Sequence, residues 1–238
     1  MNDELGPGAL APASRTQQGL WYLEGLAAEP SANTVCRAYA LSGALDVPAL
    51  YAAWRATAER HEALRTRFAE SGGVPWQRIE AGCDAPELID LSGAPEPARA
   101  GAVARLLPAL ASLSATEPPH GPGGPGGGAG VRDGGPPARL TVLRLAESEH
   151  VLVVALHRLV ADESTLRMVV AETAEHYSAA VEGRDADVPF VALQYRDYAL
   201  WEDERHAGSE IRALTAWWSA ALASPPPELV LPGDRPAD

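Results

Sequence analysis

The side chains best suited to chemistry in this 238-residue chain stand together in one short segment, His157-Arg158-Leu159-Val160-Ala161-Asp162-Glu163. A histidine exchanges a proton near neutral pH and a carboxylate can accept one, whereas an arginine only donates hydrogen bonds, since its pKa exceeds about 12. Such side chains suit proton transfer or the stabilisation of a developing negative charge. The segment is therefore a candidate reactive centre.

The elements that flank this segment can hold it rigidly. The apolar run from Val151 to Leu156 predicts a strand, and its nearly continuous valines and leucines are typical of a strand buried on both faces. Periodic apolar residues from Leu166 to Val181 predict a helix. We therefore expect His157 at the end of a strand and Asp162 at the start of a helix.

Charge and composition exclude several classes of function. The formal net charge of −13, with no Lys/Arg cluster to offset it, argues against nucleic-acid binding. The apolar runs fall short of the roughly 20 residues that span a bilayer, and the acidic N-terminus argues against a signal peptide. Cys36 and Cys83 lack metal-ligand spacing, as do the histidines, so we expect free thiols in the cytoplasm and neither metal nor cofactor.

The order of the elements predicts an α+β fold in one domain, residues 1–238. Ser14 and Gln17 fit a capping box that begins a helix, and Ser71-Gly72-Gly73 fits the turn of a hairpin. Residues 1–13 are expected to be a flexible lead-in, and residues 115–137 a Gly/Pro-rich mobile loop within the domain. These glycines do not form a phosphate cradle, because no strand directly precedes them and no Lys-Ser/Thr pair follows.

Four stretches, in this order, resemble the condensation domains of non-ribosomal peptide synthetases. Residues 14–21 are similar to the family's SxAQxRLW, with Thr16 and Gly19 departing from it, and residues 60–68 match RHExLRTxF completely. Residues 157–163 stand where HHxxxDG is expected, and residues 195–201 match YxDYAxW. Residues 225–238 resemble the start of the linker between the family's two lobes.

The resemblance covers essentially the whole chain but only the N-terminal half of the family's domain. It implies a single chloramphenicol-acetyltransferase-like lobe, a mixed sheet backed by helices. In the family, two such lobes enclose a tunnel in which an amide bond forms between thioesters carried on the phosphopantetheine of partner carrier proteins. The implied partners are therefore aminoacyl or peptidyl carrier proteins or other synthetase subunits, with a second lobe or a tailoring oxygenase as further candidates.

The resemblance also assigns roles to the candidate catalytic residues His157, Arg158 and Asp162. In the family the second histidine is assigned to the amine, whereas the first histidine and the aspartate are structural. The second histidine position here holds Arg158, and the final glycine position holds Glu163. Losing a positioned base costs about 10²- to 10⁴-fold in rate, so we expect the chain to be catalytically impaired.

Several structural roles compete with catalysis. His157 is expected to be a hydrogen-bonded core residue, and Asp162 a helix cap or the partner of Arg60 or Arg65. Arg158 is hypothesised to form an ion pair with Asp162 or Glu163 that fills the former site. Within residues 60–68, His61 is expected to pack in the interior. Tyr195, Tyr198 and Trp201 are expected to pack between helix and sheet.

Three interpretations of the function follow. The chain is the N-terminal lobe of a condensation domain that works only with a second lobe. Alternatively it is a non-catalytic platform, because some condensation-like domains carry HRxxxD followed by an acidic residue and recruit haem oxygenases to the carrier-bound peptide, and HRLVADE is similar to that pattern. Thirdly, it is a stand-alone half-domain that binds a carrier protein or a synthetase subunit.

Overall fold

A computed structural model of the chain describes residues 10–26, 33–113 and 131–224. The chain divides into two units, residues 1–200 and residues 201–238, and each is described by itself. The predicted inter-lobe linker, residues 225–238, and most of the predicted lead-in and Gly/Pro-rich loop lie outside the described residues.

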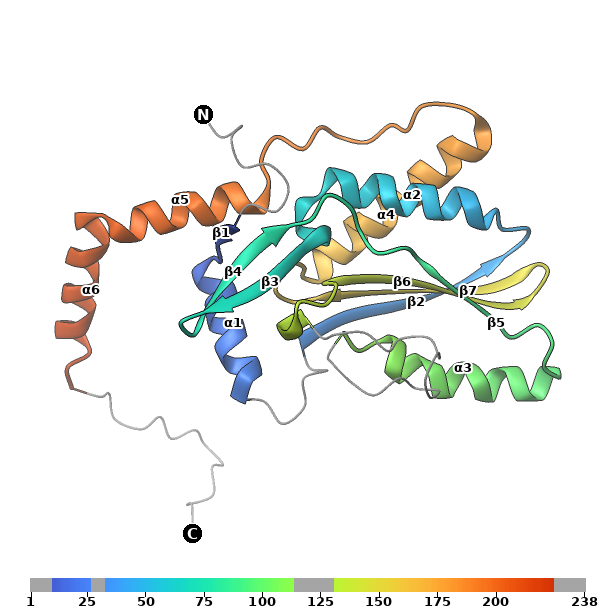
Figure 1. Cartoon of the computed structure of the whole chain (residues 1–238), viewed down its shortest axis with the longest axis horizontal. Coiled ribbons are helices and arrows are strands. Elements are labelled where there is room, and N and C mark those ends of the chain that lie inside the picture. Colours follow the sequence, from blue (N-terminus) through green and yellow to red (C-terminus); the bar gives the residue numbers. More distant parts are fainter. Residues whose placement is uncertain (1–9, 27–32, 114–130, 225–238) are drawn as a thin grey trace, which may run out of the picture. The chain divides into compact units, whose positions relative to one another are not determined.

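The first unit is built around a four-stranded sheet (Figure 1). It is a mixed sheet, as the family resemblance implies. Its strands are β2 (Thr34–Ser42), β7 (Glu149–His157), β6 (Ala138–Ala146) and β5 (Glu87–Asp90), in that spatial order. The pairs β2–β7 and β7–β6 are antiparallel, whereas β5 and β6 are parallel. Because the sheet contains both antiparallel and parallel pairs, it is a mixed sheet. The parallel pair requires a crossover connection between β5 and β6.

Helices cover both faces of this sheet. The helices α2 (Val47–Arg60) and α4 (Glu163–Glu182) lie on one face, and α3 (Glu96–Leu110) lies on the other (Figure 1). Along β7, Leu152 and Val154 join the core under α2 and α4, whereas Val153 packs with α3. The prediction that this strand is buried on both faces is therefore confirmed, and it explains why apolar residues occupy consecutive positions.

A second, smaller sheet has the order β1–β4–β3, with β1 (Leu10–Pro12), β4 (Val74–Ile79) and β3 (Thr66–Ser71). The predicted hairpin is confirmed, and its turn places Gly72 at φ 61° and Gly73 at φ 80°, where a side chain would be strained. The prediction of a flexible lead-in is wrong for its last residues. Leu10–Pro12 pair with β4, and Ala11 and Ala13 are buried, because the hairpin offers them a free edge.

The helix α1 (Arg15–Leu26) begins with the predicted capping box. The Gln17 amide N–H donates to Ser14 Oγ over 3.2 Å, and the Ser14 amide N–H donates to Gln17 Oε1 over 2.9 Å. Both groups are buried, so the reciprocal pair satisfies backbone donors that would otherwise be orphaned. Two 3₁₀ helices, Glu62–Arg65 and Val131–Asp133, also belong to the first unit.

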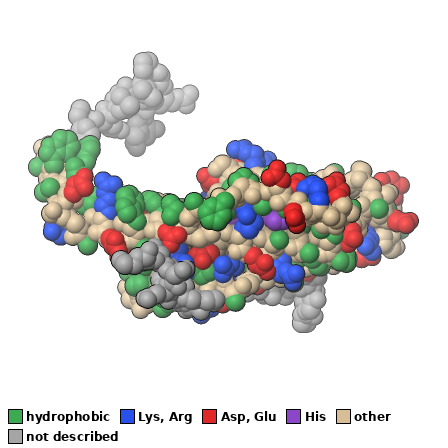
Figure 2. All heavy atoms as spheres, turned by 90° about the horizontal axis from the view of Figure 1, so that it is seen from above, with side chains coloured by type: hydrophobic (Ala, Val, Ile, Leu, Met, Phe, Trp, Pro, Cys, Tyr) green, Lys and Arg blue, Asp and Glu red, His purple; other side chains and the backbone are tan. Residues whose placement is uncertain are grey.

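The helix α5 (Tyr195–Ala207) begins in the first unit and ends in the second, where α6 (Ser209–Ala221) follows. No residue of α6 is buried, and its exposed apolar side chains include Leu214, Trp217 and Trp218. Figure 2 shows acidic and basic side chains interspersed over one face of the molecule. Among the helices that the structure describes, none is long and apolar enough to cross a bilayer.

Candidate functional site

His157 is the last residue of β7 and is buried at 1% exposure. Its backbone N–H donates to Pro137 O over 2.8 Å, and its carbonyl accepts the N–H groups of Val160 and Ala161. These bonds form the tight turn that carries the chain from β7 into α4. The expected strand–turn–helix is therefore present, and the prediction that His157 is a hydrogen-bonded core residue is confirmed.

Both ring nitrogens of His157 have partners. The Leu159 N–H donates to Nδ1 over 3.2 Å, so this nitrogen carries no proton. The proton therefore resides on Nε2, which lies 3.2 Å from Glu24 Oε1 and donates to it. His157 is held in one tautomer inside the core, and this geometry leaves it no lone pair to offer a substrate.

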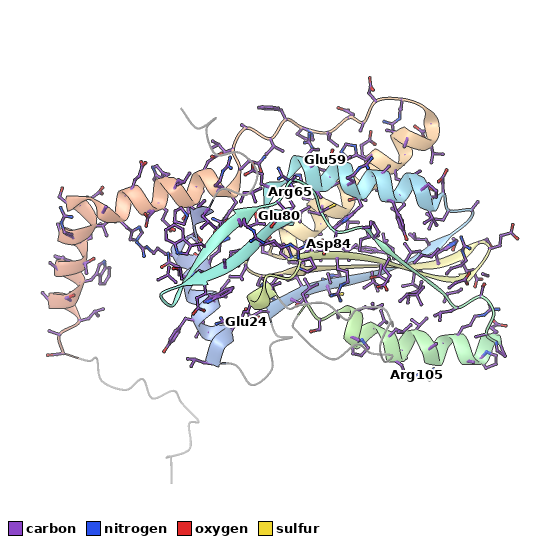
Figure 3. All side chains as sticks on the ribbon, viewed as in Figure 1. Glu24, Glu59, Arg65, Glu80, Asp84 and Arg105 are labelled. Atoms are coloured by element: carbon purple, nitrogen blue, oxygen red, sulfur yellow. The ribbon has the colours of Figure 1, made fainter. Side chains whose placement is uncertain are left out.

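Glu24 is a site residue that the sequence analysis missed. It lies on α1, is 6% exposed, and its second oxygen, Oε2, is buried without a hydrogen-bond partner among the described residues (Figure 3). A signal was available, because Gln17, Trp21 and Glu24 are spaced four and three apart and form the buried face of the helix. A carboxylate on a buried helix face needs a partner from elsewhere in the fold.

Arg158 differs sharply from its neighbour. Its side chain is exposed, and its backbone N–H donates to Asn33 O over 2.8 Å. Within the described part of the chain its guanidinium makes no ion pair and no hydrogen bond. The turn therefore presents five N–H donors to solvent at the position where the motif would place a second histidine.

Asp162 is the N-cap of α4. Its Oδ1 accepts from the Thr165 N–H over 2.7 Å, from Thr165 Oγ1 over 2.8 Å and from Ser164 Oγ over 2.7 Å. The backbone hydrogen bond from Thr165, followed by the two hydroxyl bonds, lowers the pKa of Asp162 far below its usual range. The alternative that Asp162 pairs with Arg60 or Arg65 is wrong, because both guanidinium groups bind other residues.

The hypothesised ion pair between Arg158 and Asp162 or Glu163 is also wrong. Glu163 Oε1 accepts from Arg37 Nε over 3.0 Å and from Arg37 Nη2 over 2.5 Å. Arg37 lies on the neighbouring strand β2, opposite Val154 of β7, three residues before the end of that strand. The carboxylate of Glu163 raises the pKa of the Arg37 guanidinium.

Arg60 and His61 bind a single carboxylate, Glu172 of α4. Glu172 Oε2 lies 3.2 Å from Arg60 Nε and 2.8 Å from His61 Nε2, and all three side chains are largely buried. Burial raises the pKa of Glu172, but the hydrogen bonds and charges of His61 and Arg60 outweigh it and leave that pKa below its ordinary value. The expected interior position of His61 is confirmed, whereas Glu172 was not anticipated.

The remaining motif residues are connected by hydrogen bonds of Arg65, Gln194 and Tyr195. Arg65 donates to the Glu80 carbonyl oxygen, and the two residues lie side by side in Figure 3. Gln194 donates to the Arg60 carbonyl over 2.9 Å and accepts from the Glu62 N–H over 3.0 Å. Tyr195 Oη lies 2.8 Å from Ser14 Oγ.

The four motif stretches therefore form one hydrogen-bonded framework in the first unit. Gln17 Nε2 adds a bond to the Leu159 carbonyl over 2.9 Å, which joins the first stretch to the third. The expectation that Tyr195, Tyr198 and Trp201 pack between helix and sheet is wrong, because these side chains are 37%, 43% and 52% exposed.

The chemical capacity of this site follows from which groups face solvent. His157 is buried with both nitrogens engaged, Asp162 is held by helix donors, and Glu163 is paired with Arg37. Arg158 is exposed, and its guanidinium has no partner among the described residues. The site can therefore bind an anion or a carbonyl oxygen through Arg158.

Comparison with known proteins identifies the framework. Residues 9–105 and 131–238 match the family model of the condensation domain. The chain is 33% identical over 232 residues to a probable non-canonical nonribosomal peptide synthetase, CymA, of Salinispora arenicola, a match that covers 95% of this chain but 3% of that protein. It is also 33% identical over 242 residues to the isonitrile lipopeptide synthase of Mycobacterium tuberculosis, with 96% of this chain and 9% of that protein covered. The chain therefore spans a small part of these relatives.

Solved structures agree with this match. One solved structure is the complex of the X-domain and OxyB from teicoplanin biosynthesis. Its matching chain is 29% identical to this one, with a TM-score of 0.69, and the match covers 97% of this chain and 49% of the solved chain. The starter condensation domain of the rhizomide synthetase RzmA matches 92% of this chain and 49% of its counterpart, with a TM-score of 0.71, and at 15% identity it supports the fold alone. The chain thus spans about half the length of these solved chains.

Proposed function

Because the chain belongs to the condensation-domain family, we propose that it is a binding lobe of a peptide synthetase in which Arg158 holds a carrier-bound substrate and does not deprotonate it. The fold is that of one chloramphenicol-acetyltransferase-like lobe, and its relatives include a nonribosomal peptide synthetase. The observation that carries the proposal is the exposed guanidinium of Arg158 beside a fully engaged His157.

The chemistry of amide formation supports this assignment. Attack of an amine on a thioester requires a group that accepts the proton and donors that stabilise the oxyanion. Arg158 supplies donors but no acceptor at any pH near neutrality. It can therefore orient a carbonyl or bind a carboxylate or phosphate, while the position of the motif's second histidine holds no proton acceptor.

A recruitment platform for tailoring oxygenases is the second candidate. It is favoured by the likeness to the X-domain of teicoplanin biosynthesis, which was solved together with OxyB, at an identity of 29% over nearly the whole chain. The HRLVADE segment is similar to the HRxxxD pattern expected of such platforms. Under this proposal the exposed donors of Arg158 bind a partner surface.

Binding measurements test the proposal directly. The immobilised 238-residue chain is exposed to apo and phosphopantetheinylated carrier proteins and, separately, to a haem monooxygenase of the same biosynthetic type. Arg158→Glu is expected to weaken carrier binding at least about tenfold, because it reverses the charge of the binding group. The matched control, Arg167→Glu, changes an exposed arginine on α4 and is expected to leave binding within about twofold.

The outcomes separate the candidates. If Arg158→Glu weakens binding of the carrier protein and not of the monooxygenase, the result supports the binding lobe. If it weakens binding of the monooxygenase and not of the carrier protein, the result supports the platform. Absence of any binding at tens of micromolar contradicts both. A parallel incubation with loaded donor and acceptor carriers is followed by mass spectrometry, and dipeptide formation that survives Arg158→Ala would contradict the loss of catalysis.

A further inference from the structure

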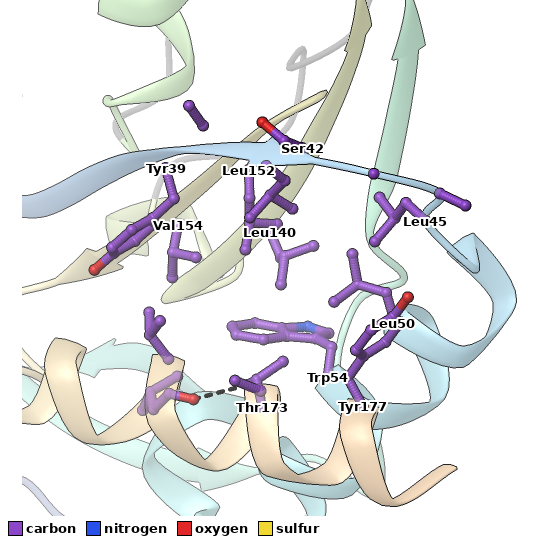
Figure 4. A pocket seen from close by; sticks show the side chains of 17 residues that line it. Tyr39, Ser42, Leu45, Leu50, Trp54, Leu140, Leu152, Val154, Thr173 and Tyr177 are labelled. Atoms are coloured by element: carbon purple, nitrogen blue, oxygen red, sulfur yellow. Dashed lines mark hydrogen bonds between the residues drawn. The ribbon is translucent and has the colours of Figure 1, made fainter. Parts of the chain in front are cut away.

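We propose that the first unit contains a binding site for an uncharged, apolar small molecule, in a cavity between the four-stranded sheet and the helices α2 and α4. The cavity has a volume of about 360 Å³ and is shown in Figure 4. None of the residues 157–163 lines it, so it is separate from the site described above. The inference does not depend on the proposed function.

The deep walls of the cavity come from the main hydrophobic core. They include Trp54 from α2, Leu140 from β6, Val154 from β7 and Val169 from α4, each at most 2% exposed. In Figure 4 the Trp54 ring lies between Thr173 on α4 and the leucines of the sheet. These residues belong to folded elements on three sides, so the cavity is a property of the packed core and not of a surface loop.

The mouth of the cavity lies where β2 turns towards α2. Ser42, Gly43, Ala44 and Ala174 line it, and all four are exposed. Small side chains at these positions leave the opening unobstructed. A molecule can therefore enter from solvent and reach Trp54 without unfolding the sheet.

The size of the cavity defines the size of its occupant. Dry apolar cavities of about 150 Å³ bind benzene, so a cavity of about 360 Å³ accommodates a molecule with two fused rings or a similar number of atoms. An unfilled cavity of this kind forfeits dispersion contacts along its walls. An apolar occupant restores these contacts and stabilises the folded unit.

The chemistry of the walls defines the charge of the occupant. No Asp, Glu, Lys, Arg or His of the described residues lines the cavity, so a charged group would be desolvated there without a partner. The polar side chains that line the cavity are hydroxyls, from Tyr39, Ser42, Thr173 and Tyr177. Tyr177 Oη accepts the Asp46 N–H over 3.1 Å and retains its own proton and a second lone pair. The site therefore suits an uncharged, mainly apolar molecule, with hydrogen bonding limited to these hydroxyls.

Indole is a suitable probe, with indole-3-carboxylate as its charged counterpart. The full chain is titrated with each compound and followed by isothermal titration calorimetry and by the shift in melting temperature. We expect saturable one-to-one binding of indole and at least about tenfold weaker binding of the carboxylate, because burial of its charge is uncompensated. Failure of indole to bind saturably, or equal affinity for both compounds, would overturn the proposal.

A matched pair of variants places the binding in the cavity. Ala174→Leu adds a branched side chain at the mouth and is expected to weaken indole binding about tenfold. Ala171→Leu makes the same change at an exposed position of α4 that does not line the cavity, and is expected to leave affinity within about twofold. Ala44→Leu, from the opposite side of the mouth, provides a second test if Ala174→Leu does not fold. Unchanged affinity in a folded mouth variant would place the ligand elsewhere.

Discussion

His61 and His157 each contact a glutamate inside the fold, and the two glutamates have different further partners. His61 shares Glu172 with Arg60, so the carboxylate has a permanently charged partner and two hydrogen bonds. His157 is the only partner of Glu24 among the described residues, and Glu24 Oε2 has none. His61 belongs to a stretch that matches its family motif completely, whereas His157 belongs to a stretch that departs from its motif at Arg158 and Glu163.

The contrast shows how the same two residue types serve different purposes. At Glu172 the positive charge of Arg60 compensates for the removal of the carboxylate from water, so the cluster can fasten α2 to α4. At Glu24 no cation among the described residues compensates, and the only bond is to a histidine whose tautomer is fixed by Leu159. This second pair holds the turn in place but leaves an unbalanced polar group in the core.

The largest expected effect is at Glu172. Glu172→Gln leaves Arg60 in a largely buried position without its counter-charge, and is expected to lower the free energy of unfolding by about 3 kcal/mol. Urea denaturation monitored by circular dichroism measures this. The control is Glu175→Gln on the same helix, where an exposed pair with Arg184 lowers the pKa of Glu175 to about 2 but should contribute far less, because water screens it. Equal losses in both variants would remove the distinction between the buried pair and the exposed pair.

The second-largest effect on stability is expected at Asp162, whose carboxylate accepts hydrogen bonds from the first turn of α4. Asp162→Ala should destabilise the fold by about 1 kcal/mol at neutral pH, whereas Asp162→Asn, which can still cap, should cost less. Because the folded-state pKa lies below the unfolded value of about 3.9, the contribution is complete above that value and is lost as the pH falls through the folded pKa. The difference between wild type and Asp162→Ala in urea denaturation should therefore shrink as the pH falls below about 4. A constant difference would assign the effect to something other than the carboxylate charge.

A smaller effect is expected at Glu24. Glu24→Gln keeps an oxygen that accepts from His157 Nε2 and removes a carboxylate that lacks a counter-charge, so the free energy of unfolding should change by less than about 1 kcal/mol in either direction. Chemical denaturation under the conditions used for Glu172→Gln gives the comparison. A loss as large as that of Glu172→Gln would show that the Glu24 carboxylate is compensated after all, and would break the contrast between the two pairs.

The smallest effect on stability is expected at Arg158. Arg158→His changes an exposed side chain with no ion pair in the described part of the chain, so the free energy of unfolding should stay within about 0.5 kcal/mol of wild type. Thermal unfolding checks this. A larger loss would mean that Arg158 supports the turn in the way that His157 does, and the two neighbours would no longer differ in role.

Local patterns predicted the elements and their ends, whereas partners from distant elements could not be predicted. The capping box of α1, the doubly buried strand β7 and the hairpin with Gly72 and Gly73 follow from spacing alone. Glu24 stands 133 residues from His157, and Glu172 stands 111 residues from His61. Such pairs depend on how helices pack across a sheet, which periodicity does not specify.

The errors have the same origin. The family resemblance implies an arginine partner for the motif aspartate, and Arg60 and Arg65 were the candidates offered beside a helix cap for Asp162. In the fold Arg60 reaches Glu172 and Arg65 reaches the Glu80 carbonyl oxygen, while Asp162 finds its donors within its own helix turn. The long, flexible arginine side chain makes its partner a property of the tertiary structure.

The two bonds of the Gln17 amide have a consequence for cooperativity. Its oxygen closes the capping box of α1, while its nitrogen donates to the Leu159 carbonyl in the turn after β7. Fraying of α1 at this end therefore releases the turn as well, so the two segments should open as one unit in native-state hydrogen exchange. The amides of residues 14–17 and 159–161 would then exchange with a common opening free energy, although Gln17 and Leu159 stand 142 residues apart in the sequence.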